Sequence, residues 1–288
     1  MSQSLADLMP VDGAAVGIRV WLKSSAYTRR LLLGESADPW ESASKYLSYF
    51  SQAQGLLKPD VAVIEVGELF DSWLGRNSGV RTELAGKRKL SFPLRKLLEQ
   101  SQPRELLAEI IEAVLAQVRG QVPVVLAMPS PRRWLQHANR LAGRDDIAVD
   151  QDSIEDAAMY IADLARAVSA YNVGGLFLEE GIDEEMVDPT DLELYRPIIN
   201  VAKHYRWPLA VRLGNAGMVA NSAVSEIEVL IGSVGLNGGG MAQGIDVGAK
   251  VWRTESVPPL LSNQFYFVEV PKDERPEHVL DCLAQLRA

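Results

Sequence analysis

Ionisable side chains lie within or after several short apolar runs of this sequence. Glu179 closes the run at 174–179, Arg212 lies inside the run at 208–213, and His137 follows the run at 122–128. Carboxylates and imidazoles exchange protons near neutral pH. Guanidinium groups bind carboxylates through paired, planar hydrogen bonds. These residue types therefore indicate proton-transfer chemistry on a carboxylated small molecule.

Several of these residues also have a purely structural interpretation. Arg132 and Arg133 follow a Pro-Ser-Pro turn and fit a solvated surface pair, and His137 fits the surface of a helix. Glu179 could simply begin the acidic run at 179–188, most of which must be solvated. The sequence leaves both interpretations open for each residue.

Arg212 and Glu65 pose a sharper question because their neighbours are apolar. Arg212 lies between Val211 and Leu213, and Glu65 lies between Ile64 and Val66. A buried charge is costly unless it is paired or faces a polar cavity. A structural salt bridge and a ligand contact would both meet this requirement.

The elements that must position these residues alternate along the chain. Continuous apolar runs are typical of parallel strands buried on both faces. We expect such strands near 15–22, 61–67, 122–128, 174–179, 208–213 and 265–270, with weaker ones near 227–232 and 249–253. The seventh strand would then end at Arg253 and Glu255.

Helix signals separate these runs. Asp38 with Pro39 predicts a helix that runs to about Leu57, while Pro103 and Pro276 each open another. Capping-box spacing starts two more helices, at 152–155 and at 190–193. A proline at 197 predicts a kink or break in the second of these.

This alternation predicts a single-domain (β/α)8 barrel over residues 1–288, with the active site at the carboxyl ends of the strands. A doubly wound open sheet is the alternative, but it usually has a glycine-rich turn after its first strand, and KSSAYTRR at 23–30 has none. An insertion at about 70–100 follows strand two. Because it is basic and loop-like, we expect a mobile or partner-contacting flap. The stretch LNGGGMAQG at 236–244 fits a flexible loop better than a phosphate-binding one.

Composition excludes several classes of function. The net charge of −9 argues against nucleic acid and anionic membranes as partners. Cys282 is the single cysteine, and with three scattered histidines it cannot supply the usual zinc ligand sets. No apolar segment approaches the ~20 residues needed to cross a bilayer. We therefore expect a cytoplasmic protein with no cofactor and no metal. A homodimer remains open.

Several segments in order resemble the superfamily of uroporphyrinogen decarboxylase and cobalamin-independent methionine synthase. They are KPDVAVIEVGELFDSWLG, ELLAEIIEAVLAQVRGQVPVVLAMPSPRRWLQHA, GGLFLEE followed by DLELYRPIINVAK, and PLAVRLGNAG, which together span roughly residues 45–215. The resemblance implies a barrel with an open polar mouth that binds a carboxylated or heteroaromatic small molecule.

The chain departs from both branches of that superfamily. WLKSSAYTRR replaces the arginine-rich opening loop of the decarboxylases, with Lys23 where their first arginine would stand, and no aspartate occurs at Gly67-Glu68. The histidine and two cysteines that bind zinc in the methionine synthases are absent. Porphyrinogen decarboxylation and thiol methylation are therefore not what we expect of this chain.

Three functions remain as hypotheses. The first is an uroporphyrinogen decarboxylase-like, cofactor-independent lyase that decarboxylates a small anionic substrate. The others are a metal-free C1 or alkyl transferase of the same superfamily, and a barrel that binds a ligand or partner without catalysis. For the lyase, the catalytic candidates are Glu68, Glu179 and His137. The substrate-binding candidates are Lys23, Arg132, Arg133, Arg212 and Asn215.

Overall fold

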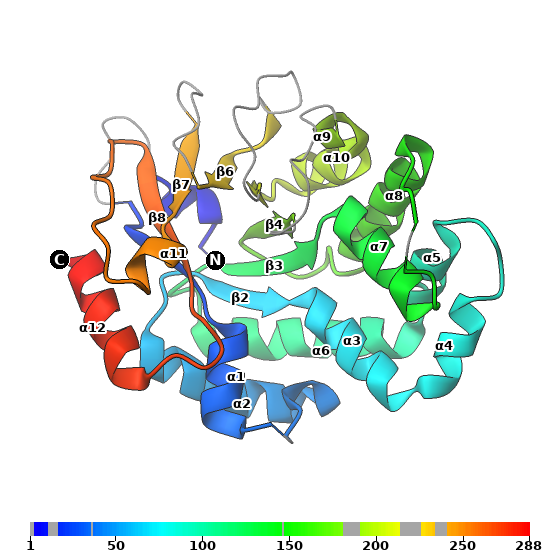
Figure 1. The fold of residues 1–288 in the computed structure, drawn as a ribbon, viewed down its shortest axis with the longest axis horizontal. Helices are drawn as coiled ribbons and strands as arrows, with labels where there is room; N and C mark the ends of the chain where they lie inside the picture. Colours follow the sequence, from blue (N-terminus) through cyan, green and yellow to red (C-terminus); the bar gives the residue numbers. More distant parts are fainter. Residues whose placement is uncertain are drawn as a thin grey trace.

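The strands of the protein form a nearly closed (β/α)8 barrel (Figure 1), so the predicted fold class is confirmed. The computed structural model describes residues 3–10, 17–35, 37–145, 147–180, 191–213, 226–233 and 241–288. The strands are β1 (Val20–Lys23), β2 (Ala62–Glu65), β3 (Val124–Pro129), β4 (Gly175–Glu179), β5 (Leu209–Arg212), β6 (Val229–Gly232), β7 (Ala242–Asp246) and β8 (Gln264–Glu269).

Seven parallel ladders join these strands in the order β1-β8-β7-β6-β5-β4-β3-β2. Within the described residues no ladder joins β1 to β2, so each of these two strands has one paired edge. We call this unpaired junction the seam. The seam is where the barrel falls short of full closure.

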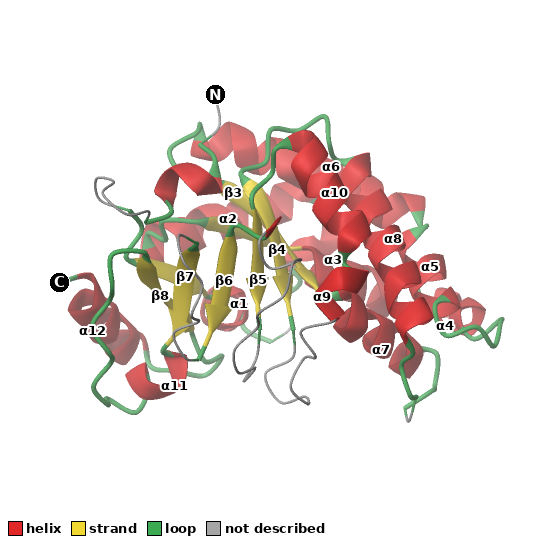
Figure 2. Ribbon diagram, turned by 90° about the horizontal axis from the view of Figure 1, so that it is seen from above, coloured by secondary structure: helices red, strands yellow, loops and turns green. Residues whose placement is uncertain are grey.

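Helices cover the outside of the sheet, and Figure 2 shows α6, α8 and α10 along one side of it. The α-helices are α1 (Ser25–Leu33), α2 (Ala43–Leu57), α3 (Val66–Arg76), α4 (Ser78–Leu84), α5 (Phe92–Leu98), α6 (Ser101–Val118), α7 (Pro131–Leu141), α8 (Gln151–Ala167), α9 (Asp191–Leu194), α10 (Arg196–Tyr205), α11 (Gly248–Val251) and α12 (Pro276–Arg287). Two 3-10 helices are η1 (Leu5–Leu8) and η2 (Pro39–Glu41). None of the described helices combines the length and apolar character that a bilayer crossing requires.

Local signals explain most helix boundaries, with two corrections. The helix predicted from Asp38 is in fact two elements: Asp38 caps η2 by accepting from the Trp40 N–H, and Ser42 then caps α2. The α8 cap is Asp150, whose side chain accepts from the Ser153 N–H, and not the predicted residue two positions later. The predicted break near the proline at 197 is confirmed, because α9 ends just before α10 begins.

The prediction for strand seven was wrong. Residues 249–253 mostly form α11, and the strand is the AQGID segment at 242–246, which includes the end of the stretch that looked like a glycine-rich loop. Residues 236–240 of that stretch lie outside the described residues. A glycine is needed inside this strand, because a Cβ at Gly244 would lie 2.7 Å from Ile231 Cγ1 and 2.8 Å from Phe265 Cζ.

The segment at 70–100 is helical, so its loop-like interpretation was wrong. It contains most of α3 and all of α4 and α5, and it buries Phe70, Leu84, Leu94 and Leu97. These helices pack against α6, α7 and α8. That the segment moves or contacts a partner stays a prediction.

Aromatic side chains fill the barrel interior. The Trp21 ring centroid lies 5.1 Å from that of Phe177, 6.1 Å from that of Phe265 and 6.3 Å from that of Phe267. At the amino-terminal end of the strands, η1 closes the barrel: Leu5 is fully buried, and its N–H donates to the Gly174 carbonyl at 2.9 Å. The polar residues at the carboxyl ends of the strands lie at the opposite end of the barrel.

Candidate functional site

Charged residues end six of the eight strands at the carboxyl end of the barrel. They are Lys23 on β1, Glu65 on β2, Glu179 on β4, Arg212 on β5, Asp246 on β7 and Glu269 on β8. The strand register places Lys23 beside Glu269, and Glu179 beside Arg212. Side chains from distant parts of the sequence therefore meet at one level of the barrel.

Arg212 is the centre of a buried ion network. Its Nη1 lies 2.6 Å from Glu269 Oε2 and 3.5 Å from Glu179 Oε1, and its Nη2 lies 2.7 Å from Asp246 Oδ2. The guanidinium carbon lies 4.6 Å from the Phe267 ring centroid. Burial alone would lower the pKa of Arg212, but the three carboxylates raise it above its usual value. At 4% exposure this side chain is fully engaged by the protein itself.

Lys23 shares the same carboxylates. Its Nζ lies 2.6 Å from both carboxylate oxygens of Glu179 and 3.8 Å from Glu269 Oε1. Burial lowers the pKa of Lys23, but the neighbouring Glu65, Glu179 and Glu269 raise it by more than burial lowers it. The pKa of Lys23 is therefore above its ordinary value. Lys23 therefore remains an ammonium group at neutral pH. It can stabilise negative charge, and it cannot act as an amine nucleophile.

Glu65 behaves differently from the other carboxylates. It is 7% exposed, and its Oε1 is buried with no hydrogen-bond partner in the part of the chain that the structure describes. Burial raises the pKa of Glu65 to about 8, despite the opposing effect of Lys23, and Glu179 and Glu68 raise it further. Near neutral pH Glu65 is therefore mostly a neutral carboxylic acid, able to donate a proton.

Lys23, Glu65 and Glu179 face a cavity of about 240 Å³ at the barrel mouth. We call it the mouth cavity. Its ionisable lining residues are Lys23, Glu65, Glu68, Asp71, Arg133, His137, Arg140 and Glu179. They come from three strand ends and from α3 and α7, the helices that follow β2 and β3.

The start of α7 sets the cationic wall of the mouth cavity. Ser130 caps the helix by accepting from the Arg133 N–H at 3.2 Å, and a proline occupies its first position. Arg133, His137 and Arg140 are spaced by four and three residues and so share one helix face. His137 Nε2 lies 2.6 Å from Asp71 Oδ1. Within the described residues, neither Arg133 nor Arg140 forms an ion pair.

Glu68, on the first turn of α3, is partly engaged. Its Oε1 accepts from Ser25 Oγ at 3.1 Å and from Arg29 Nη2 at 3.2 Å. Its Oε2 is buried and has no hydrogen-bond partner within the described ranges. Burial raises the pKa of Glu68 above its ordinary value, against the opposing effect of Arg29.

The predicted site residues separate into two groups. Those brought together at the mouth cavity are Lys23, Glu68, Arg133, His137 and Glu179. Those that do not line it are Arg132 and Arg212, the second of which adjoins the cavity through Glu179. Asn215 lies outside the described residues.

Other residues near the site were not predicted from the sequence as site residues. Asp246 was missed because strand seven was misplaced, and Arg140 because helical spacing from Arg133 was not followed along α7. Glu180, which from the sequence fits either a strand end or the start of the acidic run at 179–188, is 2% exposed and accepts from Ser130 Oγ at 2.6 Å and from the Tyr195 hydroxyl. It faces the helices, whereas Glu179 faces the mouth cavity, as alternation along a strand requires.

The described residues include no group of three or more His, Cys, Asp or Glu side chains placed to hold a metal ion. What they do bring together is a carboxylic acid, an ammonium group, two unpaired guanidinium groups and a His–Asp pair. Such a set can bind an anion and exchange protons with it. No protein-family model matches the chain, and no curated protein matches it.

Proposed function

We propose that the protein is a lyase that decarboxylates a small carboxylated molecule in the mouth cavity. One observation carries the proposal: a carboxylic acid, Glu65, and an unpaired guanidinium group, Arg133, line the same cavity as the ammonium group of Lys23. An anion-binding group and a proton donor are the two things that this reaction asks of the protein.

Arg133 would bind the substrate through a carboxylate. Its guanidinium group forms no ion pair within the described residues, so binding an anion there costs no internal salt bridge. Arg212, by contrast, would have to leave three carboxylates. The cavity of about 240 Å³ is smaller than the roughly 300–1,000 Å³ typical of ligand pockets, which favours a small metabolite over a porphyrinogen.

The reaction breaks the bond between the substrate carbon and its carboxylate. The electron pair moves into an acceptor within the substrate, such as the carbonyl of a β-keto acid or an electron-poor position of a heteroaromatic ring. Carbon dioxide leaves, and Glu65 delivers its proton to the carbon that has lost it. The glutamate left behind is stabilised by Lys23 and regains a proton from water, so each turnover consumes one proton.

His137 is the second proton-transfer group of the mouth cavity. Its bond to Asp71 fixes the orientation of the ring and leaves the other ring nitrogen available. An imidazole held in this way can donate a proton to a substrate oxygen as the acceptor group gains negative charge, and can take the proton back when Glu65 protonates the carbon. This gives the carbonyl of a β-keto acid a donor distinct from Glu65.

A panel of small β-keto acids and heteroaromatic carboxylic acids tests the proposal. In D2O, proton NMR would show one deuteron at the carbon that lost carbon dioxide, and a coupled assay would measure the gas. Glu65→Gln should bind a turned-over acid but release no carbon dioxide. Arg133→Ala should raise its KM by roughly 30-fold or more, the usual effect of removing a buried charged contact.

Arg132→Ala is the matched control, because this neighbouring arginine does not line the mouth cavity and its loss should leave KM within about twofold. Binding of panel acids without release of carbon dioxide would contradict the proposal and favour a ligand-binding barrel. Full turnover by Glu65→Gln would contradict the assignment of the proton donor.

A further inference from the structure

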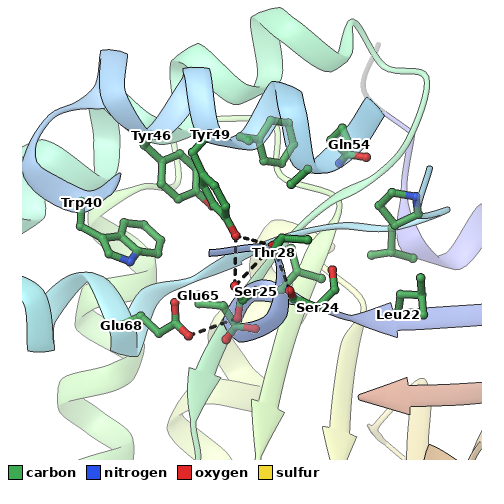
Figure 3. A pocket seen from close by; sticks show the side chains of 15 residues that line it. Leu22, Ser24, Ser25, Thr28, Trp40, Tyr46, Tyr49, Gln54, Glu65 and Glu68 are labelled. Atoms are coloured by element: carbon green, nitrogen blue, oxygen red, sulfur yellow. Dashed lines mark hydrogen bonds between the residues drawn. The ribbon is translucent and has the colours of Figure 1, made fainter. Parts of the chain in front are cut away.

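A second cavity lies at the seam of the barrel. It lies under α2, between the unpaired edges of β1 and β2, and has a volume of about 50 Å³ (Figure 3). We call it the seam cavity. Its walls include the side chains of Trp40, Tyr46, Tyr49 and Phe50, and Glu65 and Glu68 lie at the end that it shares with the mouth cavity.

The ionisable side chains that line the seam cavity are all acidic. Glu65 and Glu68 line it, and none of its lining residues is a lysine, arginine or histidine. In Figure 3, Tyr46 and Tyr49 reach from α2 toward these two carboxyl groups. Aromatic rings attract cations through their negative faces, most strongly where water is excluded. Carboxyl groups under aromatic rings therefore favour a cation and disfavour an anion.

Two acceptor atoms at this site lack donors. Glu65 Oε1 and Glu68 Oε2 are buried, and neither has a hydrogen-bond partner among the described residues. Lys23 is directed to Glu179 and Glu269, and Arg29 is directed to the other oxygen of Glu68. Leaving a buried acceptor unpaired is costly, so an occupant with at least two N–H donors is favoured.

The volume of the seam cavity limits the size of its occupant. A water molecule needs roughly 10–15 Å³ of such a cavity, so the seam cavity suits an occupant of only a few heavy atoms. The Trp40 indole N–H also has no partner among the residues described. The same is true of the indoles of Trp21 and Trp134, so this donor does not identify the occupant. A bare metal ion is disfavoured because it needs several charged or oxygen ligands, and among the described residues no group of three or more His, Cys, Asp or Glu side chains is placed to hold one.

We propose that the seam cavity binds a small ammonium-type cation, such as ammonium or methylammonium, between Glu65 and Glu68. The N–H groups would donate to Glu65 Oε1 and Glu68 Oε2, and the aromatic rings of α2 would enclose the rest of the ion. The inference rests on this cavity and its unpartnered oxygens, and it holds whether or not the mouth cavity decarboxylates its ligand.

Binding would couple the two cavities because they share Glu65. The charged groups around Glu65 are Lys23 on β1, Glu68 on α3, Glu179 on β4 and Glu269 on β8, with the tyrosines of α2 above it. A cation beside Glu65 favours its ionised form and so releases its proton. Affinity should therefore increase by about tenfold per pH unit up to about pH 8 and then level off.

Calorimetric titration of the full-length protein with methylammonium chloride, at constant ionic strength between pH 6 and pH 8.5, tests this. We expect one site, proton release on binding, and the pH dependence described above. Glu65→Gln should weaken binding about 30-fold or more. Ala53→Leu should abolish it by filling the cavity from α2 while leaving both carboxyl groups in place.

Glu105→Gln is the matched control, since it removes one negative charge from the exposed face of α6 and should bind as the wild type does. Tetramethylammonium, too large and without N–H donors, should not bind. Undetectable binding at pH 8, equal affinity in Glu65→Gln, or equal affinity for tetramethylammonium would each overturn the proposal. So would a crystal structure with methylammonium that shows only water in the seam cavity.

Discussion

The protonation of Glu65 makes the stability of the protein depend on pH. Its pKa in the folded protein is about 8, against an ordinary value of 4.5. Between these values the folded state holds a proton that the unfolded state has lost. Stability should therefore decrease as the pH rises from about 4.5 to 8, and change little above that. Glu65→Gln, which cannot ionise, should be more stable than the wild type at pH 9, by on the order of 2 kcal/mol.

Urea denaturation at pH 5 and pH 9 measures this difference. The two proteins should be close in free energy of unfolding at pH 5 and diverge at pH 9, with Glu105→Gln as the control that shows no such divergence. A Glu65→Gln effect of equal size at both pH values would show that Glu65 is ionised throughout.

Arg212 should matter to stability more than to ligand affinity. Arg212→Met leaves Glu179, Asp246 and Glu269 with one remaining cation, and breaking a buried pair in this way costs about 3–5 kcal/mol. Adding Asp246→Asn should recover part of the loss, because it removes one of the carboxylates left unpaired. Melting temperatures would measure both effects, and Arg253→Met at the exposed surface should change little.

If Arg212→Met instead melts as the wild type does but loses affinity for a mouth-cavity ligand, the ion network is not what holds this side chain. Residue types and their spacing alone could place Arg212 near the barrel mouth, but they could not decide between a structural ion pair and a ligand contact. In a strand, the register decides which way each side chain points. In a helix, the angle between successive residues decides it. Because successive helical residues differ by about 100°, Arg132 and Arg133 cannot both face the cavity.

Strand β7 shows how crowding inside the barrel constrains one element. Gly244→Ala would place a methyl group 2.7 Å from Ile231 and 2.8 Å from the ring of Phe265. The ring is held in the aromatic interior, so we expect a loss of about 1–3 kcal/mol in the free energy of unfolding. Gly75→Ala is the control: nothing lies within 4 Å of its Cβ position in α3, and it should stabilise the protein by up to about 1 kcal/mol.

Chemical denaturation of the two glycine variants distinguishes packing from helix propensity, and equal effects on the free energy of unfolding would contradict the crowding argument.

The same crowding explains why β7 was not predicted from the sequence. Its interior position requires glycine, so the segment lacks the apolar run that revealed β2, β3 and β5. In α5 the buried Leu94, Leu97 and Leu98 have helical spacing, but the surrounding lysines and arginines obscured it.

Closure of the barrel at its amino-terminal end depends on η1. Leu5 is fully buried there, beside the start of β4, and a Cβ on Gly175 would lie 3.4 Å from its side chain. Leu5→Ala should therefore cost about 2–4 kcal/mol through lost burial and the cavity left behind. Leu8→Ala, at a half-buried position of the same 3-10 helix, should cost less.

Thermal denaturation followed by circular dichroism checks the order of the two variants. Methylammonium affinity should not change in either, since the seam cavity is lined by other elements. A loss of affinity in Leu5→Ala alone would mean that η1 supports the seam as well as the opposite end of the barrel.

The seam also bears on aggregation. A fully closed barrel has no free strand edge, whereas an unpaired edge is a template for hydrogen bonding to another chain. Here β1 and β2 each leave one edge without a strand partner among the described residues, and the aromatic side chains of α2 cover the gap between them. Protection against intermolecular strand pairing thus depends largely on a single helix. Substitutions that loosen α2 should make the protein aggregate while most of its sheet is still folded.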